Sequence, residues 1–220
     1  MFHEPTRAFG MLAQRPSAWC PLLLLIVANC GLLYWYFSYV DIAWLMEKMV
    51  ATIPNAAQRE AAMKAMSSSL KTISVVGPVL SVPLVAALTA LYFVIVGKVK
   101  NIDFGFGKGF ALSLWASVPS LLMVILGSMQ IALNPGGQLE LSQLNPVSLN
   151  QLLFQVEMGH PWASWLDSLS VVTIWNIVLL MIGFEVWAKV SRATAAKVAL
   201  IPYVVVYGVW AAINLMGNGA

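Results

Sequence analysis

Glu185 is the ionisable side chain with the clearest chemical interest, because it is the only acidic residue inside the apolar stretches that predict membrane-spanning helices. An ionisable group within lipid is costly, so it marks a candidate site for a substrate, an ion or a proton. Lys189 follows four residues later, and an ion pair at the level of the lipid headgroups would explain Glu185 without any function. Both interpretations stay open from the sequence.

Three asparagine side chains extend this candidate into an intramembrane polar seam. Asn176 precedes Glu185 by nine positions and lies on nearly the same helical face, while Asn29 and Asn214 belong to other apolar stretches. Amides inside a membrane commonly hydrogen-bond between helices rather than bind a ligand. The seam therefore has a structural interpretation beside the functional one.

No arrangement of residues in the sequence predicts an enzyme, a cofactor or a metal site. His3 and His160 fall on opposite sides of the membrane in the topology derived below, and neither has a serine and acid at the spacing of a hydrolase. Cys20 and Cys30 are separated by about 15 Å of helix and cannot form a disulfide. The glycines of residues 105–109 lack the strand and the spacing of a phosphate-binding loop. We therefore expect a non-enzymatic protein with no cofactor.

The composition places these residues in a membrane protein. The chain has 220 residues, of which 60% are hydrophobic and 10% charged, and its mean hydropathy is +0.81. Soluble domains are much less apolar. The net charge of +3 fits an excess of Lys and Arg on cytoplasmic loops, so we expect the lipid bilayer and not nucleic acid as the partner.

Five stretches of about 20 residues or more are apolar enough to cross a bilayer as helices. The expected fold class is an all-α, polytopic membrane protein with a five-transmembrane-helix bundle, formed by residues 1–220 as a single domain. The expected spans are residues 19–40, 72–96, 110–133, 169–187 and 198–216.

Four prolines lie within these expected spans. A proline inside a helix removes an N–H donor and leaves a carbonyl that needs another partner in lipid. We expect the helices to kink at Pro78, Pro83, Pro119 and Pro202.

Short amphipathic segments connect the spans. Residues 42–49 carry apolar side chains at helical spacing, and Asn55 is the expected N-cap of a second surface helix that ends near residue 69. A third is expected after Asn145 and Pro146, with an apolar face that includes Leu149 and an end near Gly159. A fourth segment, residues 1–17, is expected to lie in the cytoplasmic headgroup layer through Phe2, Phe9 and Leu12.

The basic residues predict the orientation. Alternating the loops between the two sides assigns eight Lys and Arg to one side and four to the other. The side richer in Lys and Arg is normally cytoplasmic. We expect the N-terminus in the cytoplasm, the C-terminus outside, and the protein in a bacterial inner membrane.

Four segments together resemble bacterial Yip1-domain membrane proteins, and the resemblance covers most of the chain. The similarity implies a five-span protein with a cytoplasmic N-terminus. It also implies roles in membrane traffic with Rab GTPases for eukaryotic relatives, whose long cytoplasmic N-terminal region this chain lacks. The segments are EPTRAFGMLAQRP (residues 4–16), GKGFALSLWASVPSLLMVIL (107–126), NPVSLNQLL (145–153) and IWNIVLLMIGFEVWAKVSRATAAKVALI (174–201).

Two functions are compatible with these features. The first is a scaffold that organises the membrane or other membrane proteins, with other membrane proteins or a second copy of the chain as partners. The alternative is a transporter or channel for a small solute or an ion, with a polar site between proline-broken helices. The absence of an inverted repeat and the odd number of spans favour the scaffold.

Overall fold

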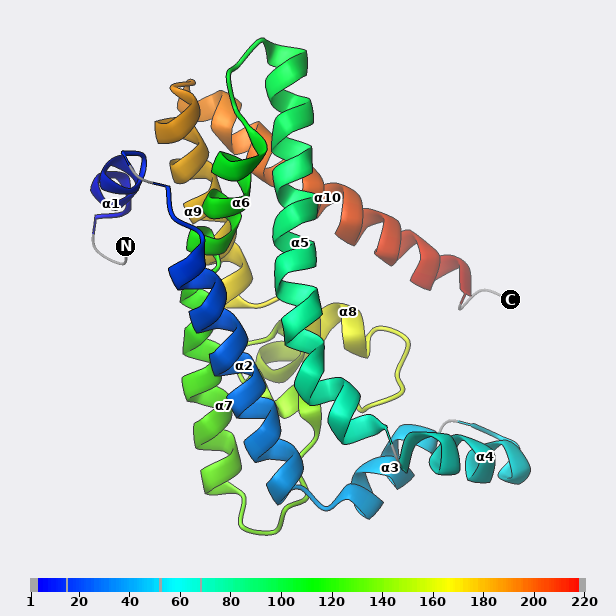
Figure 1. Cartoon of the computed structure of the whole chain (residues 1–220). Helices are drawn as coiled ribbons and strands as arrows, with labels where there is room; N and C mark the ends of the chain where they lie inside the picture. Colours follow the sequence, from blue (N-terminus) through cyan, green and yellow to red (C-terminus); the bar gives the residue numbers. More distant parts are fainter. Residues whose placement is uncertain (1–3, 15, 52, 68, 218–220) are drawn as a thin grey trace. The chain divides into compact units, whose positions relative to one another are not determined.

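The computed structural model describes residues 4–14, 16–51, 53–67 and 69–217 of the chain. It is 80% helical, and the residues that it describes form no β-strand. Five of its helical segments are long and apolar enough to cross a membrane (Figure 1). The predicted fold class, an all-α membrane protein with five transmembrane helices, is confirmed.

The membrane-spanning helices begin and end close to the residues expected from hydropathy. The largest difference is in the fifth span, whose helix begins at Arg192 rather than at residue 198. The second span continues to Lys100 rather than ending at residue 96. The spans are α2 (Trp19–Tyr39), α5 (Leu70–Lys100), α6 (Phe106–Ala116) with α7 (Leu121–Leu133), α9 (Val171–Ala188) and α10 (Arg192–Gly217).

The third span is interrupted at a proline. A single turn of 3-10 helix, η1 (Val118–Ser120), separates α6 from α7 and contains Pro119. This ring has no N–H to donate, so the regular hydrogen-bond pattern cannot continue through it. Helices α5 and α10 continue through Pro78, Pro83 and Pro202, and bending at these three positions stays a prediction.

The chain divides into two compact units, and each is described here by itself. The two units are defined by contacts: residues contact others of their own unit more than those of the other unit. The expectation of a single domain, which concerns folding as one body, stays a prediction. The first unit contains Met1–Ile26, Leu80–Ser120 and Val172–Ile213, and the second contains Val27–Val79, Leu121–Val171 and Asn214–Ala220.

The core of the first unit is aromatic. The rings of Phe93 and Phe184 stack with centroids 5.1 Å apart, and Phe104 lies against both. Gly183 allows a close approach beside this stack, because an added Cβ would overlap the buried side chain of Leu112. Aromatic pairs of this kind stabilise a core beyond the area that they bury.

The N-terminal helix α1 (Pro5–Leu12) belongs to this core. Phe9 is completely buried, its ring meets that of Trp187 edge to face, and the Trp187 indole N–H donates to the Phe9 carbonyl at 2.8 Å. The sequence predicts a helix here with Phe9 and Leu12 on one face, and both side chains pack in the core of the first unit. A position in the cytoplasmic headgroup layer stays a prediction. Phe2 lies outside the described residues.

In the second unit, the aromatic end of α2 is held by hydrogen bonds to the chain that follows α7. The buried Tyr36 hydroxyl donates to the Leu139 carbonyl at 2.7 Å, and the Tyr39 hydroxyl donates to the Asn134 carbonyl at 2.6 Å. Lys71 lies over the ring of Tyr34, with its ammonium 5.2 Å from the ring centroid. These aromatic side chains therefore hold the connection that follows α7 against the end of α2.

Two of the expected surface helices are present, α3 (Ile42–Val50) and α4 (Ala56–Ser67). Asp41 caps the first through its side chain, and the Asn55 Oδ1 accepts from the Ala57 N–H at 2.9 Å at the start of the second. The predicted N-cap at Asn55 is confirmed.

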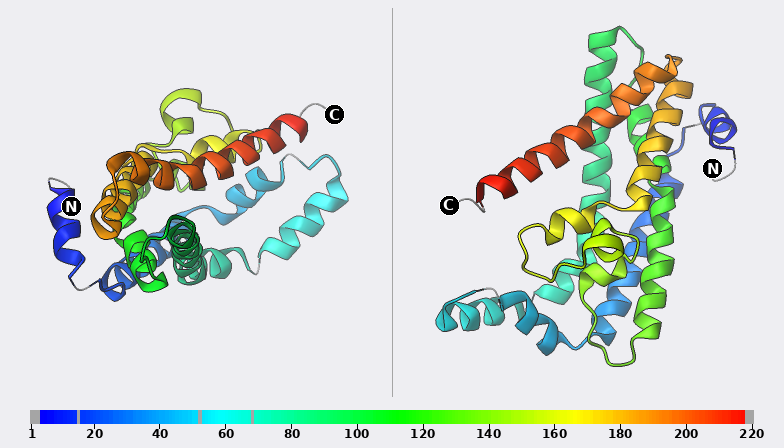
Figure 2. Two further views of the ribbon diagram at one scale, coloured as in Figure 1. Left: turned by 90° about the horizontal axis from the view of Figure 1, so that it is seen from above. Right: turned by 180° about the vertical axis from the view of Figure 1, so that it is seen from behind.

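The prediction of a third surface helix, from Asn145 to Gly159, is wrong. The connection between α7 and α9 has only short turns, seen in yellow in the second view of Figure 2. Side chains compete for the backbone here: Asn150 Nδ2 donates to the Val156 carbonyl at 3.2 Å, and the Val156 N–H donates back to Asn150 Oδ1 at 2.9 Å. The turns are η2 (Leu141–Leu144), the π-helical turn η3 (Asn150–Phe154) and α8 (Ala163–Ser168).

Candidate functional site

Asn176, the first of the predicted seam residues, bonds across two helices of the first unit. With its amide nitrogen facing the neighbouring carbonyls, it donates to the Ala116 carbonyl at 3.1 Å and to the Val172 carbonyl at 3.3 Å. Ala116 is the last residue of α6, where the helix stops before Pro119. The amide therefore satisfies a backbone acceptor beside the helix break, which is the structural role open to an amide in lipid.

Glu185 lies in the last turn of α9, and its side chain is partly exposed. The helix ends at Ala188, and Lys189 has a φ of +53°, so it is no longer in helical register with Glu185. Within the described ranges, no ion pair joins the two side chains. The headgroup ion pair that would explain Glu185 is therefore absent there.

The four seam residues fall into different units. Asn176 and Glu185 belong to the first unit, whereas Asn29 and Asn214 belong to the second. The Asn214 Nδ2 is buried and has no acceptor in the part of the chain that the structure describes. A seam that joins all four residues stays a prediction.

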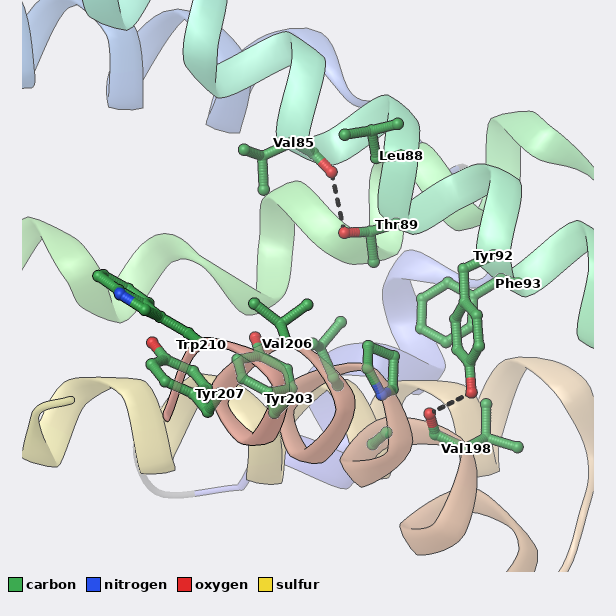
Figure 3. A pocket seen from close by; sticks show the side chains of 13 residues that line it. Val85, Leu88, Thr89, Tyr92, Phe93, Val198, Tyr203, Val206, Tyr207 and Trp210 are labelled. Atoms are coloured by element: carbon green, nitrogen blue, oxygen red, sulfur yellow. Dashed lines mark hydrogen bonds between the residues drawn. The ribbon is translucent and has the colours of Figure 1, made fainter. Parts of the chain in front are cut away.

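A groove in the first unit lies on the surface of two membrane-spanning helices (Figure 3). It lies between α5 and α10, has a volume of about 380 Å³ and is open along one side. Val85 and Leu88 form the α5 wall and are 60% and 59% exposed, while the buried Phe93 and Leu180 close the inner side.

A row of aromatic rings forms the α10 wall of this groove, which we call the α5–α10 groove. Tyr203 and Tyr207 lie with ring centroids 6.4 Å apart and planes at 10°, and Tyr207 and Trp210 lie 6.4 Å apart at 17°. Their spacing of four and then three residues places the rings on one face of the helix, as Figure 3 shows. The wall is therefore flat, wide and largely apolar.

Tyr92 lies at one end of the groove and hydrogen-bonds to a backbone carbonyl of α10. Its hydroxyl donates to the Val198 carbonyl at 2.9 Å. Val198 is four residues before Pro202, so its carbonyl is the one that loses its helical partner to the proline ring. The hydrogen bond from α5 supplies the missing donor.

Two polar groups on the α5 side of the groove are engaged with backbone carbonyls. The Thr89 hydroxyl donates to the Val85 carbonyl at 2.9 Å, and Tyr92 is bound to Val198. The surface that faces outward is aromatic and aliphatic, without an acid, a base or a nucleophile along the wall. Such a surface suits an apolar chain rather than a reaction.

Metal binding finds no support in the described residues, where no group of three or more His, Cys, Asp or Glu side chains comes together. The His160 Nδ1 accepts from the Trp162 N–H at 3.2 Å. Cys20 and Cys30 are free thiols. His3 lies outside the described residues.

The sequence prediction missed the α5–α10 groove. The aromatic spacing of Tyr203, Tyr207 and Trp210 is visible in the sequence and would have identified an aromatic helix face. The pairing of Tyr92 with the carbonyl freed by Pro202 has no signal in sequence, because it depends on which two helices are neighbours.

A family model, the Yip1 domain, matches residues 1–213. No curated protein and no solved structure is similar enough to the chain to match it.

Proposed function

Because this chain belongs to the Yip1 family of integral membrane proteins, we propose that it is a non-enzymatic scaffold that holds other membrane proteins through its α5–α10 groove. The occupant that we propose for the groove is a transmembrane helix, either of a second copy or of another membrane protein. The single observation that carries this proposal is the row of three aromatic rings on an open, apolar groove.

The two walls of the groove come from the spans with the least internal packing. In the most apolar stretch of α10 only 11% of the residues are buried, and in that of α5 only 17%, against 28–39% in the other spans. Lipid tails are as apolar as these side chains, so helix association in a membrane depends on shape and close packing. A groove with a rigid aromatic wall can enclose part of another helix, whereas a helix surface without a groove cannot.

We further propose that the N-terminus faces the cytoplasm, that the C-terminus faces outside, and that the membrane is a bacterial inner membrane. The support is the excess of Lys and Arg on the loops of one side.

Photo-crosslinking tests the groove directly. Benzoylphenylalanine is placed at Val206, which lines the groove and is 59% exposed, in the full chain within native membranes. We expect a protein adduct, and its mass distinguishes a second copy from another protein. Val205, which is 55% exposed but does not line the groove, is the matched control.

The expected result is a discrete protein adduct from position 206 and none from position 205. Adding Trp210→Ala or Tyr207→Ala should weaken the adduct, because either change removes part of the aromatic wall. Equal protein adducts from both positions, or adducts with lipid only, would contradict the proposal.

The transporter alternative has less support. The amide of Asn176 and the hydroxyl of Tyr92 are used to satisfy carbonyls at Pro119 and Pro202. A transport site at a helix break needs such groups to face the solute instead.

A further inference from the structure

The connection between α7 and α9 in the second unit encloses a second hollow, of about 430 Å³. It lies outside the spans, and its lining mixes serine hydroxyls with apolar side chains that include Val156, Met158 and Ala163. Two further lining residues, Asn145 and Asp167, carry polar atoms that the fold buries.

Asp167 is held by buried neutral donors. The side chains of Ser148 and Asn150 hydrogen-bond its carboxylate, and both are almost completely buried, with 0% and 1% exposure. Ser148 also forms a β-bridge with Ser170 at the start of α9, so the carboxylate sits on a fixed backbone. The Asp167 Oδ1 is buried and accepts no hydrogen bond within the described residues.

Asn145, which also lines this hollow, carries a second acceptor without a donor. Its Nδ2 donates to the Asp167 carbonyl at 3.2 Å, which fixes the orientation of the amide. Its Oδ1 is buried and has no donor among the residues that the structure describes. Two residues that line one hollow therefore each carry a buried acceptor oxygen without a donor, and one of these oxygens belongs to a carboxylate.

The charge of Asp167 has no cation opposite it in the described part of the chain. The Asp167 side chain is partly buried, and its Oδ1 is a buried oxygen without a donor. A cationic donor would relieve both the charge and the unpaired oxygen. A bare metal ion fits poorly, because Ca²⁺ takes six to eight oxygen ligands and the hollow offers one carboxylate. Its volume and apolar lining suit a small organic cation instead.

We propose that this hollow binds a primary ammonium group, with Asp167 and Asn145 accepting its N–H donors, and that the ammonium belongs to the headgroup of an aminophospholipid. The surroundings favour a lipid over a soluble amine. Leu153 and Phe154 of the neighbouring π-helical turn are 72% and 56% exposed, as expected for side chains that rest in a bilayer interface.

Native mass spectrometry of the full chain in mild detergent tests the site. Phosphatidylethanolamine and phosphatidylcholine with the same acyl chains are added in turn, since the second has the charge but no N–H donor. We expect the ethanolamine lipid to be retained in preference. Asp167→Asn should weaken its retention about 10-fold or more, because it removes a charge-assisted hydrogen bond to the ammonium.

Glu157→Gln is the matched control, because it makes the same charge change at an exposed position outside the hollow. It should leave retention unchanged. If Asp167→Asn fails to fold, competition with free ethanolamine on the wild-type chain still tests the site. Displacement of the bound lipid by ethanolamine supports the proposal. Binding of free ethanolamine by a chain that retains no lipid would overturn the lipid assignment. Equal retention of both lipids without ethanolamine binding, or retention unaffected by a folded Asp167→Asn, would overturn the proposal.

Discussion

The two units of the molecule differ in charge. The segments of the first unit contain eight Lys and Arg against three Asp and Glu, a formal charge of +5, whereas those of the second contain four against six, a charge of −2. Loops richer in Lys and Arg are normally cytoplasmic. The difference in charge therefore supports the orientation proposed above, in which the basic loops, all in segments of the first unit, are cytoplasmic.

The units also differ in how they are held together. The first is packed through stacked phenylalanines and carries an apolar groove. The second has an apolar core around Tyr36 and, in addition, an irregular connection with hydrogen bonds of the buried Ser148 and Asn150 side chains. Rigid helices offer a fixed surface to another helix. The connections between helices carry more polar side chains, and ligand sites are concentrated in such connections. This contrast is why we assign helix docking to one unit and headgroup binding to the other.

The largest effect is expected from Phe184→Ala, which removes a completely buried ring from the aromatic stack. It should destabilise the first unit by about 3–5 kcal/mol through the cavity it leaves. Hydrogen exchange should increase in α6 and α9 while the residues around Tyr36 in the second unit keep their protection. An equal increase in both units would show that they do not respond separately.

A smaller effect is expected from Tyr92→Phe, which leaves the Val198 carbonyl without a donor. The cost should be about 1–3 kcal/mol, as for other buried groups that lose their partner. Pro202→Ala restores an N–H four residues after Val198, so the same Tyr92→Phe change should cost less in that background. Unfolding free energies from steric trapping measure the cycle, and strict additivity of the two changes would refute the pairing.

A pH effect is expected in the second unit alone. Burial raises the pKa of the Asp167 carboxyl, and the hydrogen bonds from Asn150 and Ser148 only partly offset this. The folded state then keeps its proton to higher pH than the unfolded state, so the stabilisation is complete below the usual aspartate pKa and is lost as pH rises through the raised value.

Hydrogen exchange across residues 145–170, corrected for the intrinsic rate and measured without aminophospholipid, should therefore increase over that interval. Asp167→Asn should abolish the change. Protection that grows with pH over the same interval would reverse the assigned direction.

No effect at all is expected on solute flux. Liposomes with the wild-type chain, Glu185→Gln or Asn176→Ala should show the same permeability to ions and small solutes, because the scaffold account gives neither side chain a transport role. Flux that depends on either residue would favour the transporter instead.

The sequence predicted the helices well because burial in lipid depends on local composition. Apolar length located every span, and the cap at Asn55 and the break at Pro119 follow from single residue types. The packing of Phe9 against Trp187 needs a partner 178 residues away, which no local pattern contains.

The candidate sites were less predictable for the same reason. The apolar spacing around Leu149 suggested a helix, but the side chain of Asn150 takes the backbone of Val156 and forms a π-helical turn instead. The sequence did not identify Asp167 as a site residue. Its environment depends on Ser148 and Asn150, which approach it only in the folded chain. The sequence therefore predicted which segments span the membrane, but not the groove and the hollow that we propose as binding sites.

The most direct test of this account is the side of the membrane on which each of two loops is exposed. In a chain with Cys20→Ser and Cys30→Ser, single cysteines replace exposed residues, Asp103 in the first unit and Gln138 in the second. A membrane-impermeant maleimide added to intact cells should label position 138 at once and position 103 only after permeabilisation. The reverse order, or labelling of both positions in intact cells, would contradict it.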